Sequence, residues 1–110
     1  MSMYAVIFSA SIREDDDDYF LMAKNLRALA IERYGCTEIK SVTEGNQEIA
    51  VSYWPSLENI QSWKSDPAHI EAQRLGQERW YGEYKVQVVR VEREYGKDLD
   101  RASGLGARGA

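Results

Sequence analysis

Residues 50–76, AVSYWPSLENIQSWKSDPAHIEAQRLG, decide the fold prediction, because a strand passes directly into two helices within them. Residues that point alternately to two faces predict a strand ending at Trp54. A Pro-Ser turn then begins a short helix that carries Trp63. Asp66-Pro67 begins a second helix, which carries His69. Asp66 or Ser65 is its predicted cap, and Pro67 is its first residue.

Four further elements are predicted outward from this stretch. Partly alternating apolar residues predict a strand over 3–12, and apolar residues at three- and four-residue spacing predict a helix over 17–34. Strands over 36–44 and 47–54 flank Gly45-Asn46, a hairpin signal, and a last strand covers 84–95. This order predicts an α+β, ferredoxin-like βαββαβ fold, with one four-stranded antiparallel sheet and its helices on one face.

The long helix has a predicted apolar face and predicted ends. The face is formed by Tyr19, Met22, Ala23, Leu26, Leu29 and Ala30. Gly35 suits the left-handed stop of a helix. The acidic run over 14–18 complements the dipole of a helix N-terminus, whereas an EF-hand loop would need a glycine and a glutamate at fixed offsets. We therefore expect a solvated helix start there and no metal site.

Composition limits the partners and the location. The chain has 110 residues, a net charge of −4 and no cluster of basic residues, which argues against nucleic acid or an anionic membrane as a partner. The one cysteine, Cys36, fits a reducing cytoplasm. No apolar run approaches the ~18 residues of a membrane span. We expect one domain over 1–96 and a flexible tail, rich in Gly, Ala and charge, over 97–110.

The predicted sheet has one face that the helices do not cover. That face carries several apolar side chains, and exposed apolar patches of this kind usually mark an interface. A two-fold symmetric pair of chains, sheet against sheet, would bury them. We therefore expect a homodimer.

A family resemblance follows from the segment over 52–96. Its block Trp63-Lys64, then His69, then Ala-Gln-Arg-Leu-Gly ending at Gly76 resembles the antibiotic biosynthesis monooxygenase superfamily, and the resemblance covers about residues 3–96. It implies that two chains form a dimeric αβ-barrel. It also implies one of three functions: oxidation of aromatic compounds by O₂ without a cofactor, cleavage of haem, or no assigned activity.

The haem-cleaving branch of that superfamily uses three residues. They are an Asn on the first strand, a Trp on the helix after the third strand, and an axial His ten residues beyond that Trp. Trp63 matches the Trp, but Gln73 stands where the axial His is expected, and the first strand offers only Ser9 or Ser11. Haem degradation is thus the less favoured interpretation, and we expect no cofactor.

The candidate site residues lie on and around the two helices. His69 and Trp63 are the candidate catalytic residues, because a neutral imidazole can act as a general base and an indole N–H can stabilise an anion. Tyr53, Gln73 and Trp80 are the candidate substrate-binding residues. Both alternatives stay open: the aromatic residues can pack as core, and His69 can serve only in structure.

The function expected from the sequence is that of a cofactor-independent monooxygenase acting on a small aromatic or quinol-like compound. The resemblance carries most of this expectation, and the aromatic residues support it. The alternative is a non-catalytic dimer that binds a small ligand or acts in a stress response, because a fold alone does not imply a function.

Overall fold

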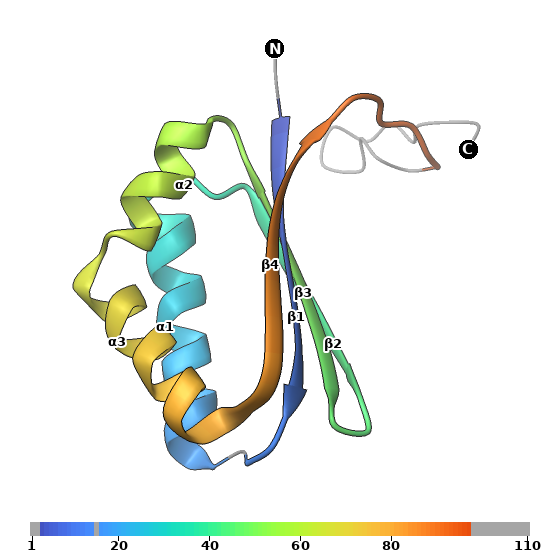
Figure 1. Ribbon diagram of the computed structural model, residues 1–110. Helices are drawn as coiled ribbons and strands as arrows, with labels where there is room; N and C mark the ends of the chain where they lie inside the picture. The colour runs from blue at the N-terminus through green and yellow to red at the C-terminus, as the bar shows by residue number, and fades with distance from the viewer. Residues whose placement is uncertain (1–2, 15, 98–110) are drawn as a thin grey trace.

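The computed structural model describes residues 3–14 and 16–97 of the chain and consists of one sheet covered by helices on one side (Figure 1). The elements are β1 (Met3–Ile12), α1 (Asp17–Arg33), β2 (Glu38–Glu44), β3 (Gln47–Trp54), α2 (Leu57–Lys64), α3 (Pro67–Leu75), the single π-helical turn η1 (Gly76–Trp80) and β4 (Tyr81–Val91).

The sheet has the strand order β2-β3-β1-β4, and all neighbouring strands are antiparallel. The helices lie together on one side of it, as Figure 1 shows. The ferredoxin-like α+β fold predicted from the sequence is therefore confirmed. Strand register divides the side chains into a helix-facing set that includes Val6, Phe8 and Trp54, and an open-face set that includes Ile7 and Tyr53.

The core lies between the sheet and the helices. It joins Val6 and Trp54 of the sheet to Ala30, Cys36 and Ile60. Trp54 is completely buried, and its indole Nε1–H donates a hydrogen bond of 2.8 Å to Ser52 Oγ. A buried indole adds a large apolar contact area, and the hydrogen bond removes the cost of burying its one donor.

Each helix begins at a side chain that satisfies backbone N–H groups. Asp16 accepts from Tyr19 N at 2.9 Å in α1, and Ser56 accepts from Asn59 N at 3.1 Å in α2. Asp66 accepts from Ala68 N at 2.8 Å in α3, followed by Pro67. The predicted helix start at the acidic run and the cap at Asp66 are both confirmed.

Three strand boundaries and one face residue differ from the prediction. β2 begins at Glu38 and not at Cys36, because Cys36 N still donates to Ala30 O and completes the end of α1. β4 begins at Tyr81 and not at the predicted residue 84, because η1 leads directly into it. It ends at Val91 and not at the predicted residue 95, because Val91 already pairs with Met3 at the start of β1. Ala23, placed on the apolar face of α1 by its spacing, is exposed.

The predicted tail over 97–110 lies outside the described residues except for Lys97. Within 3–14 and 16–97, no helix is both long enough and apolar enough to cross a membrane.

The open face of the sheet carries an apolar patch. Its exposed members are Val42 (69%), Ile49 (46%) and Val89 (37%). Val42 and Ile49 are direct cross-strand partners between β2 and β3. Ile7 and Val51, a partner pair between β1 and β3, lie on the same face nearer the middle of the sheet.

Candidate functional site

Trp63 and His69 form a contacting pair across the turn between α2 and α3. Their ring centroids are 4.4 Å apart and the planes meet at 75°. Trp63 also packs against the buried Trp54, with centroids 5.0 Å apart. The sequence-predicted catalytic residues are therefore adjacent, and they are backed by the main core.

Both members of the pair have a buried nitrogen without a hydrogen-bond partner. These atoms are Trp63 Nε1 and His69 Nδ1. Buried polar atoms are nearly always paired, so each of these two nitrogens is available to a further hydrogen-bond partner. Burial, and then the nearby Lys64 ammonium, lower the pKa of His69, so its imidazole is neutral near pH 7.

The turn beneath the pair is fixed by Asp66. Its Oδ2 accepts a 2.6 Å hydrogen bond from the hydroxyl of Tyr34, at the end of α1. This hydrogen bond lowers the pKa of Asp66 and raises the pKa of Tyr34. A second hydrogen bond joins α2 to the end of α1: Asn59 Nδ2 donates to the Tyr34 carbonyl at 3.0 Å. The start of α3, and with it His69, is thereby held to α1.

A second group of polar and aromatic residues lies farther along the helix-facing side of β1. We call it the Tyr81 cluster, and it consists of Phe8, Tyr19, Glu48, Trp80, Tyr81 and Tyr84. The hydroxyl of Tyr19 donates to Glu48 Oε1. Tyr81 packs on Tyr19, Tyr84 and Phe8 with centroid separations of 6.0, 6.0 and 5.3 Å. Trp80, only 1% exposed, meets Tyr19 edge-on and has no hydrogen-bond partner for Nε1.

Burial controls protonation in the Tyr81 cluster. It is the largest cause that raises the pKa of Tyr81 to about 12. Burial also raises the pKa of Tyr19, and the hydrogen bond to Glu48 adds to the effect. The two phenols also influence one another: Tyr81 adds to the rise in the pKa of Tyr19, whereas Tyr19 lowers the pKa of Tyr81. Both phenols therefore keep their protons at neutral pH.

A β-bulge directs Tyr81 toward the helices. The register between β1 and β4 shifts between Ser11 and Ile12, so that Ile12 opposes Tyr81 and Gly82 is the extra residue. Ser11 Oγ accepts from Glu83 N at 2.9 Å and closes the bulge. Simple alternation would have turned Tyr81 to the open face.

Gly76 makes room for the ring of Tyr81. A Cβ added at Gly76 would lie 2.5 Å from Tyr81 Cε2, closer than real Cβ contacts allow. Gly76 is also the first residue of the π-helical turn, and the backbone N–H of Tyr81 donates to its carbonyl. Such turns are rare and are frequent at functional sites.

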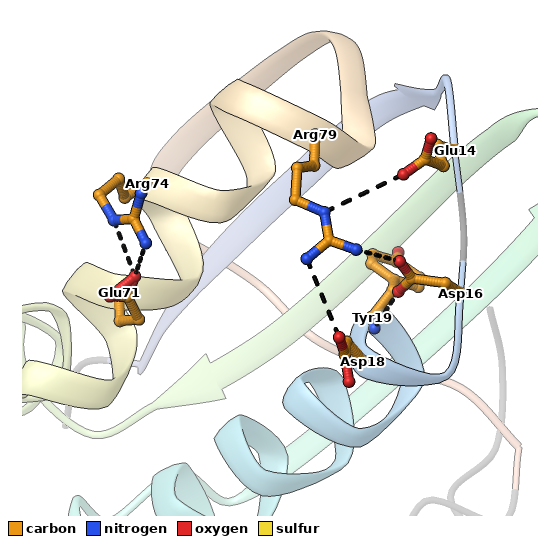
Figure 2. A network of polar contacts seen from close by, with 7 residues as sticks. All are labelled: Glu14, Asp16, Asp18, Tyr19, Glu71, Arg74 and Arg79. Atoms are coloured by element: carbon orange, nitrogen blue, oxygen red, sulfur yellow. Dashed lines mark hydrogen bonds and ion pairs between the residues drawn. The ribbon is translucent and has the colours of Figure 1, made fainter.

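An arginine fixes the same turn to α1. Figure 2 shows Arg79 of η1 pointing at three carboxylates: Asp16, which it contacts directly, Asp18 at 3.9 Å and Glu14 at 4.0 Å. The acidic run therefore serves as helix cap and ion-pair partner. In the part of the chain that the structure describes, no three His, Cys, Asp or Glu residues group as they would to hold a metal ion.

The three predicted substrate-binding residues do not gather at one place. Tyr53 opposes Ala5 on the open face, so the sheet separates it from Trp63 and His69. Gln73 is exposed on α3. Trp80 lies in the Tyr81 cluster, which includes Phe8. Trp63 instead packs on Trp54, which pairs with Tyr4, about 13 Å from Phe8 along β1. His69 and Trp80, the candidate residues on α3 and η1, therefore belong to two different groups.

Sequence reasoning missed Glu48 and Tyr81. A readable signal existed for Glu48, because strand alternation puts this carboxylate on the same face as Ser52 and Trp54. No such signal existed for Tyr81, whose direction depends on the bulge. A hollow of about 140 Å³ also lies apart from both groups, between the end of β1 and the β2–β3 turn.

Comparisons with known proteins agree with this architecture. No family model matches the chain. The uncharacterized protein YqjZ of Bacillus subtilis is 37% identical over 92 residues, which cover 83% of this chain and 81% of that protein. Among solved structures, a mutant form of SnoaB of Streptomyces nogalater, a cofactor-independent oxygenase, superposes with a TM-score of 0.72 at 7% identity and covers 86% of this chain and 97% of its own.

A second solved structure extends the fold comparison. It is a Nitrosomonas europaea protein proposed to be an antibiotic biosynthesis monooxygenase, with a TM-score of 0.70 at 11% identity, covering 86% of this chain and 94% of its own. The resemblance expected from the sequence is thus confirmed at the level of the fold. The chain belongs to the same family as YqjZ, and it shares its fold with SnoaB and with the Nitrosomonas europaea protein.

Proposed function

We propose that the protein is a cofactor-independent monooxygenase that oxidises a small aromatic or quinol-like compound with O₂. The observation that carries the proposal is the contacting pair of Trp63 and His69, each with a buried nitrogen that lacks a partner. The similarity in fold to SnoaB, described as a cofactor-independent oxygenase, supports it.

The proposed reaction needs no electron donor besides the substrate. A ring CH₂ group next to an aromatic carbonyl or enol loses a proton, and the resulting anion transfers one electron to O₂. Recombination of the carbon radical with superoxide and a proton gives a hydroperoxide, which loses water to leave a carbonyl. The net reaction, CH₂ + O₂ → C=O + H₂O, balances atoms and electrons.

The two residues have separate roles in this proposal. His69 is neutral near pH 7, so a ring nitrogen is free to accept the substrate proton. Trp63 Nε1–H donates to the oxygen on which the negative charge of the substrate anion accumulates. The surrounding indole of Trp54 keeps the site apolar, which strengthens both interactions.

Oxygen uptake with anthrone, whose CH₂ lies between two aromatic rings, tests the proposal. We expect uptake above the autoxidation rate in proportion to protein, strongly reduced in Trp63→Phe and His69→Gln. The exposed Glu32→Gln of α1 is the matched control and keeps the full rate. Equal rates in all four proteins, or none above autoxidation in the wild type, would contradict the proposal. Tight binding of anthrone without turnover would favour the non-catalytic ligand-binding alternative.

We propose further that two copies pair through the open face of the sheet. The exposed apolar side chains Val42, Ile49 and Val89 support this pairing, because burying them removes apolar area from water. Sedimentation equilibrium of Ile49→Glu should give a monomer. Phe20→Glu changes an apolar site on α1 that is more exposed (59%, against 46% for Ile49), and this variant should remain dimeric. A monomeric wild type would overturn the pairing.

We also propose a cytoplasmic location. Its support is that the one cysteine, Cys36, is buried and unoxidised, with its thiol pKa raised by burial. Fractionation of the native host tests this, and recovery of the protein outside the cytoplasm would contradict it.

A further inference from the structure

His69 Nδ1 is buried and has no hydrogen-bond partner, although its side chain begins beside a polar helix cap. Asp66 is the N-cap of α3 and Pro67 is the first helical residue, so His69 stands at the third helical position. A polar side chain at this position can reach back to the N-cap residue, as it does in a capping box. The polar atoms of Asp66 are therefore the partners that the helix start offers to the imidazole.

Each polar atom of Asp66 already has another partner. Three of the hydrogen bonds are local: its N–H donates to Trp63 O at 3.1 Å, its carbonyl accepts from Ile70 N at 3.0 Å, and Oδ1 accepts from Ala68 N at 2.8 Å. The fourth comes from α1, because the Tyr34 hydroxyl, 32 residues away in sequence, donates to Oδ2 at 2.6 Å. The hydroxyl of Tyr34 thus takes the carboxylate oxygen that the local backbone leaves free.

The backbone of Tyr34 is itself fixed at the junction of α1 and α2. Its carbonyl accepts a hydrogen bond of 3.0 Å from Asn59 Nδ2. Gly35 permits this close approach: its φ is +80°, and a Cβ added there would lie 2.5 Å from Asn59 Nδ2. The Tyr34 hydroxyl is therefore presented to Asp66 by a residue that is held at both ends.

Charged groups of opposite sign act on His69. Burial and then the Lys64 ammonium of α2 lower the pKa of the imidazole, whereas the Asp66 carboxylate raises it. The Tyr34 hydroxyl, and to a smaller extent Arg33 of α1, keep the pKa of Asp66 low, so this carboxylate is ionised near neutral pH. Two charged side chains of η1 are paired elsewhere, Glu78 with Arg74 and Arg79 with Asp16. The placement of the Asp66 carboxylate therefore affects how readily His69 takes up a proton.

We propose that Tyr34 is a positioning residue for His69: its hydroxyl keeps the Asp66 carboxylate from pairing with the imidazole, so that a ring nitrogen retains a free lone pair. Without this hydroxyl, Asp66 Oδ2 loses its donor, and a protonated His69 is a neighbouring group that can replace it. The inference rests on the proposed function only in giving His69 the role of the base.

Titration of His69 by proton NMR tests the proposal without substrate. The chain has one histidine, so the Cε1–H signal of the imidazole is unambiguous. In Tyr34→Phe the titration midpoint should rise by about one pH unit, as expected for a closer opposite charge. Asp66→Asn keeps a residue that can cap α3 but removes the charge, so its midpoint should fall below that of the wild type. Tyr95→Phe, at an exposed site beyond β4, is the matched control and should titrate as the wild type does.

The double variant Tyr34→Phe/Asp66→Asn separates positioning from a general loosening of the structure. Because it has no carboxylate to release, it should titrate as Asp66→Asn does. An unchanged midpoint in Tyr34→Phe overturns the proposal, and so does a rise of equal size with and without the Asp66 charge. These titrations are independent of oxygen uptake, so failure of the oxygenase proposal would be recognised separately.

Discussion

The indole of Trp63 meets the imidazole of His69 edge-on, with 4.4 Å between centroids, and the two rings carry unpartnered buried nitrogens, Nε1 and Nδ1. Aromatic pairs in this geometry contribute about 0.5–1.5 kcal/mol beyond area burial. The contact therefore restrains the orientation of both rings.

Replacement of Trp63 by Phe removes the Nε1–H donor and keeps an aromatic ring against Trp54. Loss of one donor to a developing anion lowers kcat by about 10²-fold, with a smaller change in KM. Steady-state oxygen uptake with anthrone measures both constants. A rise in KM at unchanged kcat would mean that Trp63 only binds the ring.

The stability of the protein should depend on pH through His69. Burial lowers the pKa of this group in the folded state, so below its ordinary value of about 6.5 the unfolded chain binds more protons. Stability should therefore fall as the pH drops below 6.5. Urea unfolding midpoints are measured at two pH values, one near neutrality and one about a unit below 6.5. The difference between the two midpoints should be smaller in His69→Gln than in the wild type. An unchanged pH dependence in the variant would show that the imidazole titrates freely.

Asp66 should contribute in a more acidic range. Its pKa in the folded state is lowered, first by the Tyr34 hydroxyl, so its stabilisation is present above the ordinary value of 3.8 and is lost as the pH falls below it. Tyr34→Phe removes the hydroxyl and leaves the cap to Ala68 N intact. Acid unfolding followed by circular dichroism should begin at higher pH in this variant than in the wild type. Coincident unfolding curves would show that the hydrogen bond from Tyr34 to Asp66 does not stabilise the protein.

Gly76→Ala should displace the ring of Tyr81, because the new Cβ would lie 2.5 Å from Cε2. Overpacking of this kind costs about 1–3 kcal/mol in unfolding free energy. Urea unfolding measures it, with Gln73→Ala as the control on the exposed side of α3. Equal stability of the Gly76→Ala protein and the wild type would show that the ring relaxes freely.

The fold could be predicted because local signals agreed with one another. Hairpin residues Gly45-Asn46, the Ser56 and Asp66 caps and the strand alternation through Trp54 all lie where the pattern put them. Each of these depends on neighbours within a few residues. The contact of Trp63 with His69 across the turn between α2 and α3 was not among these predictions.

The rest of the candidate site depends on contacts that are distant in sequence. The direction of Tyr81 is set by a register shift against Ser11 and Ile12 of β1, near the other end of the chain, which alternation within β4 does not reveal. Tyr53 is a candidate substrate-binding residue by sequence, but the pleat of β3 places it on the face of the sheet opposite Trp63.

The most direct measurement is the reaction of anthrone under ¹⁸O₂ with wild type, Trp63→Phe and His69→Gln, followed by mass spectrometry of the product. The account predicts one heavy oxygen in the new carbonyl, formed at a rate proportional to wild-type protein and strongly reduced in both variants. A product formed no faster than by autoxidation, or formed equally fast by all three proteins, would contradict it.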